Sequence, residues 1–277
     1  MTAATAPAPA PHAASPLRWV LSDSWTVARR DLIHWTRNPT VIVAGLAFPI
    51  MFVLLYGYVF GSAMIVPGGG DYREFLMPGM FAQTMMFGAA ATISAVAADK
   101  ARGVTDRFRS MPMAQPAVVV GRSAADMVNS VLDLAVLVAC GLLVGWSSNT
   151  GPLPTLTAFG LLLLLRFAMI WVGIYLGLVV SQEAAASTWA LLFPLTMISN
   201  TFVDPSLMPA WLGTVAEWNP LSATVAATRE LFGNSVPELV GTSWPAQNAL
   251  LLAVVWPVLI VAIFLPLAVR RYHSAAR

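Results

Sequence analysis

Charged residues are scarce in this chain. Asp, Glu, Lys and Arg make up only 10% of its 277 residues, and 58% are hydrophobic, whereas a typical soluble domain is about 25% charged. There is also a single cysteine, Cys140, so an intrachain disulfide and a disulfide-rich secreted scaffold are both excluded. This composition predicts an integral membrane protein.

Motifs that carry chemistry are missing as well. A nucleotide-binding P-loop needs a glycine-rich turn before its lysine, but the single lysine, Lys100, follows Ala-Ala-Asp. The three histidines, His12, His34 and His273, form no H-E-x-x-H motif and lie outside the apolar runs, so no metal site is expected. There is no G-x-S-x-G turn and no basic soluble domain for nucleic acid. We therefore predict a non-catalytic chain without a cofactor of its own.

The two ends of the chain differ from its middle. Residues 1–16 are rich in Ala and Pro and carry no charge, which predicts a disordered tail. Residues 17–38 place apolar side chains on one helical stripe and Asp23, Arg30 and Arg37 on the other side, which predicts an amphipathic helix in the membrane interface. Residues 271–277 are predicted to be a cytoplasmic tail. The apolar stripe consists of Leu17, Leu21, Trp25, Ala28, Leu32 and Trp35.

Between these ends, six apolar runs of about 20 to 25 residues are each long enough to cross a bilayer as a helix. Alternating strands of a β-barrel are not seen. We expect an all-α integral membrane protein with a six-span domain over residues 39–270. The runs are 41–62, 75–98, 123–145, 156–180, 184–203 and 246–269.

The basic residues predict the orientation. With six spans, the N-terminal segment, the loop 99–122 and the C-terminus lie on one side with twelve Lys and Arg residues, and the other side has only Arg73 and Arg229. The positive-inside rule makes the first side cytoplasmic. We therefore expect a multi-pass protein of the cell membrane with both termini in the cytoplasm. The outward segment 204–245 has helix signals at Pro209 to Trp218 and at Ser222 to Phe232, which predict two short helices between spans five and six.

Ionisable residues inside spans are costly, and they usually face a bundle interior or a cavity. Asp126 and Asp133 share one face of the third run, together with Asn129, and Arg166 lies in the fourth run. We expect Asp133 and Arg166 to meet near the midplane and pair. Such a pair either joins two helices or forms a polar element beside a transport path.

Two G-x-x-x-G patterns permit close helix packing, either within the chain or between subunits. They are Gly57 with Gly61 and Gly173 with Gly177.

The loop 99–122 is the only sizeable charged segment between spans. Arg102, Asp106 and Arg109 recur at helical spacing, and Pro112 ends the helix. A short charged helix at the end of a span is suited to docking a partner. The alternative is a loop that only sets topology by its positive charge.

Several stretches resemble the ABC-2 type permeases, and specifically the daunorubicin/doxorubicin-resistance kind. The loop sequence RGVTDRFRSMPMA at 102–114 is similar to the first cytoplasmic loop of that family. The similarity covers nearly the whole chain and includes SDSWTVARRDLIHWTRNP (22–39), LMPGM (76–80), GRSAADM (121–127), LLLLLRFAMIWVGIYLG (161–177), AEWNPLSATVAATRELFGN (216–234) and FLPLAVRRY (264–272).

This resemblance implies the membrane subunit of an ABC exporter of hydrophobic or amphipathic compounds in a bacterial cell membrane. It implies a separate ATPase subunit that binds ATP and Mg, a second copy or a related six-span permease, and contact with membrane lipids. The segment 99–113 matches the family's coupling helix, which docks into the ATPase. The docking residues implied are Asp99, Lys100, Arg102, Asp106, Arg107, Phe108, Arg109 and Met111.

Two other functions stay open at this point. One is a proton-coupled secondary transporter with Asp126, Asp133 and Arg166 as its relay, although no inverted repeat is visible. The other is a membrane assembly or sensor protein without a transport role.

Overall fold

The computed structural model describes residues 25, 26, 29, 33, 39–60, 71–104, 115–235 and 241–274. Among these residues every regular element is helical, as the all-α prediction requires. Of the predicted interfacial helix only Trp25, Thr26, Arg29 and Ile33 are described; they are helical and exposed. The rest of that helix and the N-terminal tail lie outside the described residues.

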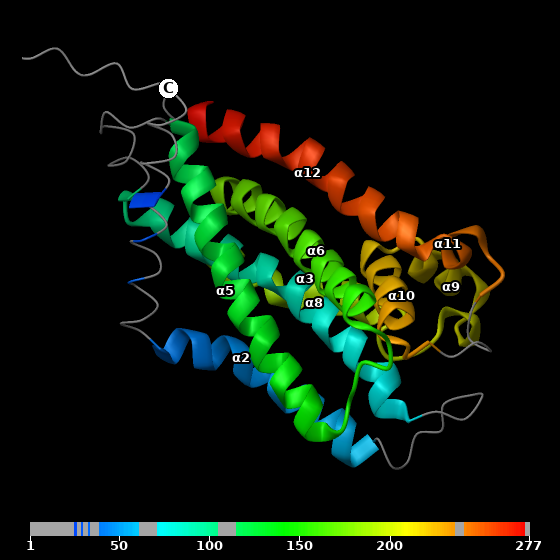
Figure 1. The fold of residues 1–277 in the computed structure, drawn as a ribbon. Helices are drawn as coiled ribbons and strands as arrows, with labels where there is room; N and C mark the ends of the chain where they lie inside the picture. The colour runs from blue at the N-terminus through cyan, green and yellow to red at the C-terminus, as the bar shows by residue number, and fades with distance from the viewer. Residues whose placement is uncertain are drawn as a thin grey trace, which may run out of the picture.

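Two long helices form the centre of the bundle. They are α3 (Tyr72–Ala101) and α6 (Pro152–Val179), and both are largely buried. Helix α12 (Ala249–Ser274) packs on α6, and α5 (Gln115–Val144) contacts both central helices. Figure 1 shows α12 and α5 on the outside of this pair, and α2 lies at an angle to α5 and approaches it near the C-terminal end of α5.

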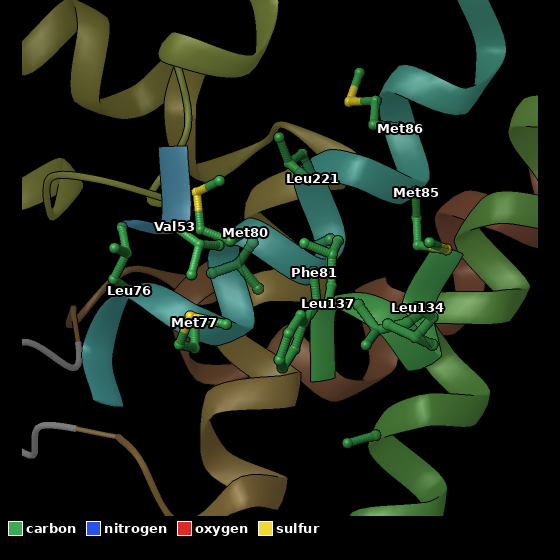
Figure 2. Packing of buried hydrophobic residues seen from close by; sticks show 14 of the residues in the cluster. Val53, Leu76, Met77, Met80, Phe81, Met85, Met86, Leu134, Leu137 and Leu221 are labelled. Atoms are coloured by element: carbon green, nitrogen blue, oxygen red, sulfur yellow. The ribbon is translucent and has the colours of Figure 1, made fainter. Parts of the chain in front are cut away.

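Local sequence signals explain where α3 begins and ends. Asp71 caps its N-terminus by accepting a hydrogen bond from the Arg73 backbone N–H, and Glu74 adds negative charge to the first turn. Lys100 places positive charge in the last turn. Between these ends the buried face is apolar and rich in methionine, and Met77, Met80, Met85 and Met86 pack with Phe81 and leucines of α5 (Figure 2).

The central helices approach each other closely because α6 carries glycines at the contact. A Cβ on Gly173 would lie 2.7 Å from the Thr92 Cβ, and one on Gly177 would lie 2.6 Å from the Val96 Cβ. Gly57 likewise faces Val144 of α5. These three glycines therefore pack within the chain, and Gly61 lies outside the described residues.

In the part of the chain that is described, four helices are long and apolar enough to cross a membrane. They span Tyr72–Ala101, Val118–Val144, Pro152–Val179 and Ala249–Tyr272. These correspond to the second, third, fourth and sixth predicted runs. Helices α5 and α12 expose much of their apolar surface, which suits contact with lipid or another chain.

The first predicted run is a shorter apolar helix. It consists of α2 (Pro39–Leu54), with Pro49 inside it, and the π-helical segment η1 (Leu55–Phe60).

The prediction of one long helix over the fifth run, 184–203, is wrong. The structure has two short helices, α7 (Gln182–Ala186) and α8 (Thr188–Met197), and the helix ends at Ile198. After Ile198, side-chain hydroxyl groups form hydrogen bonds with backbone groups. Ser199 Oγ donates to the Thr196 carbonyl over 2.6 Å, and the Asn200 N–H donates to Ser222 Oγ over 3.1 Å. Hydropathy alone did not reveal this competition for the backbone.

At one end of the bundle, short helices follow α8. They are η2 (Pro205–Leu207), α9 (Ala210–Glu217), α10 (Pro220–Phe232) and α11 (Trp244–Gln247). Asn219 caps α10, and Gly233 ends it with a left-handed φ of 71°. Helix α10 packs among α3, α6 and α12, and Figure 1 shows this group gathered at the end of the bundle where α12 begins. Both helices within 204–245 thus lie near their expected positions.

The glycine contact between α3 and α6 predicts a position-specific effect. Gly177→Ala should lower the free energy of unfolding by about 1–3 kcal/mol, because the added methyl overlaps Val96 and the Ile93 carbonyl. Gly160→Ala on the same helix is the control, since no atom lies within 4 Å of the Cβ it would gain, and it should be neutral or stabilising by up to about 1 kcal/mol. Reversible unfolding in mixed micelles measures both, and equal effects at the two positions would contradict the close contact.

Candidate functional site

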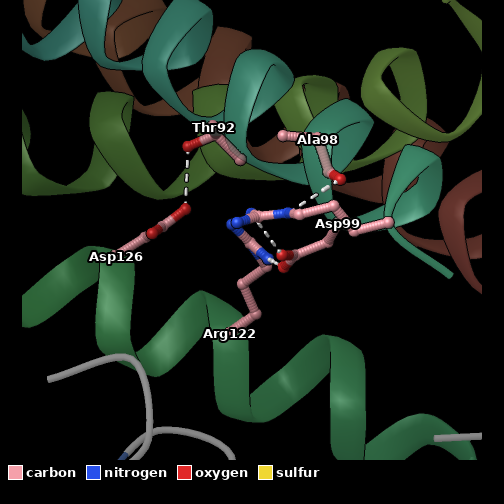
Figure 3. Close-up of polar contacts among 6 residues, drawn as sticks. Thr92, Ala98, Asp99, Arg122 and Asp126 are labelled. Atoms are coloured by element: carbon pink, nitrogen blue, oxygen red, sulfur yellow. Dashed lines mark hydrogen bonds and ion pairs between the residues drawn. The ribbon is translucent and has the colours of Figure 1, made fainter. Parts of the chain in front are cut away.

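The base of the predicted docking loop is held by an ion pair between two helices. Asp99 lies in the last turn of α3, and Arg122 lies in α5. Arg122 Nη1 donates to Asp99 Oδ2 over 2.5 Å, and both side chains are mostly buried. Figure 3 shows the two groups meeting across the space between the helices. Arg102 Nη2 donates to the other oxygen of Asp99 over 3.1 Å, but its side chain is exposed, so this second pair contributes little.

A third helix joins the same end of the bundle. Lys100 Nζ donates to the Leu178 carbonyl over 2.9 Å, at the C-terminus of α6 where backbone carbonyls lack intrahelical partners. Ser94 Oγ also donates to the Ala185 carbonyl of α7 over 3.4 Å. The last turns of α3 are therefore connected to α5, α6 and α7.

Some of the residues predicted to dock the ATPase therefore contact other helices of this chain. Asp99 and Lys100 belong to α3 and contact neighbouring helices, and Arg102 lies just beyond the helix end. The other five residues lie outside the described residues, so their docking role stays a prediction. They are Asp106, Arg107, Phe108, Arg109 and Met111.

Deeper in the bundle, α3, α5 and α6 meet in a buried polar network. Arg166 of α6 is 4% exposed, and Asp126 of α5 is 8% exposed. Arg166 Nη2 donates to Thr92 Oγ1 over 3.2 Å, and Thr92 Oγ1 donates to Asp126 Oδ2 over 2.8 Å. The Thr92 hydroxyl therefore stands between the cation and the carboxylate, and Figure 3 shows it directed toward Asp126.

Ser130 forms the second arm of this network. Arg166 Nε donates to Ser130 Oγ over 2.6 Å, and Ser130 Oγ donates to the Asp126 carbonyl over 2.7 Å. Each hydroxyl both accepts and donates, as buried hydroxyl groups require. The arrangement places opposite charges near each other without direct contact.

The expected direct pair between Asp133 and Arg166 is not formed. Asp133 accepts from Asn129 Nδ2 on its own helix over 2.9 Å, and the guanidinium contacts Thr92 and Ser130 instead. Asp133 lies three residues beyond Ser130, about 4.5 Å farther along α5. The prediction assigned the partner of Arg166 to Asp133. In the structure Thr92 and Ser130 bind the guanidinium, and Asp126 is the carboxylate that Thr92 connects to it.

Sequence reasoning also missed the glycine that makes room for Arg166. A Cβ on Gly88 of α3 would lie 2.5 Å from the guanidinium carbon, so any larger residue would displace the side chain. The signal was present in the spacing, since Gly88 and Thr92 are four residues apart and lie on one face of α3.

A second buried arginine lies near the other end of α3. Arg229 of α10 donates from Nε to the Phe75 carbonyl over 2.8 Å and from Nη2 to the Thr201 carbonyl over 3.0 Å. Its guanidinium carbon is 3.6 Å from the centroid of the Phe75 ring. Burial lowers the pKa of Arg229 to about 9, and Asp204 and Tyr72 partly oppose this shift, so the group is cationic at neutral pH.

These features define a multi-pass helical membrane protein whose charged groups gather at both ends of its bundle and in one buried network. Residues 23–232 match the sequence profile of the ABC-2 type transporter family. The chain therefore belongs to the ABC-2 type transporter family, as its motifs indicated.

The most informative relatives are drug-resistance permeases. The chain is 31% identical to the daunorubicin resistance ABC transporter permease protein DrrB1 of Streptomyces coeruleorubidus, over 88% of this chain and 84% of that protein. It is 20% identical to the probable doxorubicin resistance ABC transporter permease protein DrrC of Mycobacterium tuberculosis, over 81% and 82%. It is 24% identical to the putative transport permease ycf38 of Cyanophora paradoxa, over 78% and 76%.

The network predicts the outcome of a charge reversal. In the double variant Asp133→Arg with Arg166→Asp, stability and transport should stay as low as in Arg166→Asp alone, because Thr92, Ser130 and Asp126 would face a carboxylate. Ser130→Ala should lower the free energy of unfolding by about 1–3 kcal/mol, since it leaves a buried guanidinium N–H unpaired. Thr157→Ala is the control, because that hydroxyl bonds only its own helix. Recovery in the double variant to the level of the unaltered protein would establish the direct pair instead.

Proposed function

We propose that this chain is the membrane subunit of an ABC exporter that moves hydrophobic or amphipathic compounds out of the cell. Its membership of the ABC-2 family over residues 23–232 carries this proposal, and the relatives named for daunorubicin and doxorubicin resistance favour amphipathic cargo. A separate ATPase subunit binds ATP and Mg, because this chain has no P-loop.

The ATPase docks on the loop between α3 and α5. The residues at the two ends of that loop form contacts with neighbouring helices, and these contacts support this role. A force on the loop reaches α5 through Asp99 and Arg122 and reaches α6 through Lys100 and the Leu178 carbonyl. Because α3 and α6 touch through Gly173 and Gly177, the two central helices respond together. A second permease completes the pathway, since the described spans of one chain form a packed core.

A proton-coupled transporter is the alternative function. Asp126, Asp133 and Arg166 lie in α5 and α6, where a relay would need them. However, Asp126 and Arg166 are both buried and connected through hydroxyls, which favours a structural role over exchange with water. Export that survives ATP depletion and stops with an uncoupler would favour the alternative.

The docking site is tested by reversing charge on the loop. Arg107→Glu with Arg109→Glu should reduce copurification of the ATPase by about tenfold or more, because close charge pairs across an interface are expensive to oppose. Arg270→Glu with Arg271→Glu, at the end of α12, is the control for basic charge elsewhere and should copurify normally. An intact complex with unchanged substrate-stimulated ATP hydrolysis in the loop variant would limit the loop to setting topology.

Transmission is tested at the base of the loop. Asp99→Asn removes the ion pair with Arg122 but leaves residues 105–114 unaltered, so the ATPase should still bind while transport per ATP hydrolysed falls severalfold. Arg102→Gln is the control, because its side chain is 64% exposed and its pair with Asp99 should contribute little. Vesicle uptake and phosphate release, measured on one preparation, give the ratio. Equal ratios in both variants would remove Asp99 from the transmission path.

A further inference from the structure

Arg73 connects three helical segments at the end of the bundle opposite the docking loop. It lies in the first turn of α3. Its Nε donates to the Gly57 carbonyl of η1 over 2.9 Å, and its Nη1 donates to the Val144 carbonyl of α5 over 3.3 Å. The guanidinium carbon is also 5.5 Å from the centroid of the Tyr58 ring. The guanidinium is therefore fixed in position by α3, η1 and α5.

These contacts hold the cation without neutralising it. Both acceptors are backbone carbonyls, which have no net charge. The two carboxylates nearest in sequence bind other groups, since Asp71 accepts from the Arg73 backbone N–H over 2.9 Å and Glu74 accepts from Asn149 Nδ2 over 3.3 Å. Within the described residues, no acidic side chain forms an ion pair with Arg73. A fixed cation without a counter-ion favours a ligand that brings negative charge.

Part of this guanidinium is open to the surface. Its Nη2 forms no hydrogen bond with any described residue, and it is not enclosed by protein. Gly145 follows α5 with a φ of 101°, and a Cβ there would lie 3.7 Å from Arg73 Nη1. A larger residue at 145 would extend over the group, whereas glycine leaves it uncovered. Nη2 can therefore donate to an anion from outside the chain.

The surface beside Arg73 is apolar. Four side chains at the ends of η1 and α5 are each more than half exposed, and they are Tyr58, Val59, Leu142 and Leu143. Tyr58 and Leu143 are adjacent, since the Tyr58 hydroxyl donates to the Leu143 carbonyl over 3.4 Å. A ligand at this place therefore meets a positive group and a lipid-facing surface together.

The depth of Arg73 fits a lipid headgroup. The buried apolar face of α3 continues from Phe75, and α5 ends at Val144 beside the guanidinium. Two spans thus reach the edge of the hydrocarbon layer here, which is where the polar headgroups begin. Figure 1 shows the C-terminal end of α5 close to the segment that follows α2. Arginine and tyrosine are both common at this boundary, with the polar tip among the headgroups.

From the fixed cation, its accessible Nη2 and the exposed apolar surface, we propose that this site binds an anionic phospholipid of the leaflet opposite the docking loop. The lipid phosphate accepts from Arg73 Nη2, and the acyl chains lie along the exposed side chains of η1 and α5. A free phosphate ion could use only the first of these contacts, so the lipid is favoured. This inference does not depend on the proposed function, because the lipid is a bound partner of the bundle and not its cargo.

The test measures which phospholipid lies beside Arg73 in nanodiscs. Cys140→Ala removes the chain's single thiol, and Leu143→Cys then carries a bimane fluorophore. Phosphatidylglycerol or phosphatidylcholine with brominated acyl chains is added at the same low mole fraction to a phosphatidylcholine bilayer, and bromine quenches the fluorophore on contact. The anionic lipid should show a relative affinity about fivefold higher, because one basic side chain near the membrane surface commonly contributes that factor.

A second reporter position is the matched control. Leu251→Cys is also about half exposed and lies near the start of α12, at the same end of the bundle, and it should show no preference between the two lipids. With the reporter at 143, Arg73→Gln should abolish the preference. Arg102→Gln, which removes an exposed arginine at the opposite end, should keep it.

Equal quenching by the two lipids at position 143 would overturn the proposal, and so would an equal preference at position 251. A preference that survives Arg73→Gln would do the same. Inorganic phosphate should have no more effect than a chloride salt of equal ionic strength, and specific displacement by phosphate would assign the site to a free anion instead. The comparison of the two reporters keeps Arg73 intact, so it remains decisive if Arg73→Gln does not fold.

Discussion

The buried guanidinium of Arg166 is the constraint on which the arrangement of the three inner helices depends. A charge in an apolar bundle is tolerated only if nearby groups replace its lost hydration. Here α3 supplies Thr92 and the space at Gly88, and α5 supplies Ser130 and Asp126. Because the contributions come from two partner helices, rotation or sliding of either one leaves polar groups unpaired. The network therefore fixes both register and rotation, which apolar contacts do weakly.

Much of the fold was predictable because it follows from long apolar runs and strong end signals. Helices α3, α5, α6 and α12 cover most of the second, third, fourth and sixth predicted runs, since hydrocarbon length and backbone pairing leave few alternatives. The short helices α9 and α10 were predictable from Asn219-Pro220 and Gly233. The prediction of one helix over the fifth run was wrong because side chains form hydrogen bonds with backbone groups there. Ser199 Oγ binds the Thr196 carbonyl, and the Asn200 N–H binds Ser222 Oγ.

The candidate site was predictable as a set of residues but not as a set of contacts. Spacing placed Asp126 and Asp133 on one face and put Arg166 on the next span. It could not choose between the two carboxylates, because that choice depends on helix rotation and on hydroxyls of Thr92 and Ser130 that carry no charge. Arg229 was counted only as a topology signal, although it is buried against Phe75. Its partners are backbone carbonyls, which every residue has.

The charged ends of α3 have a consequence for how the protein sits in a bilayer. From Glu74 to Asp99 the helix rises by about 38 Å at 1.5 Å per residue, while the hydrocarbon layer is about 30 Å thick. Arg73 donates to the Gly57 and Val144 carbonyls, so η1 and the end of α5 lie at the same depth as the start of α3. The helix must then tilt, or the bilayer must thicken locally. Since α6 is in close contact with it, the two helices share that inclination, and membrane thickness becomes a variable that acts on both at once.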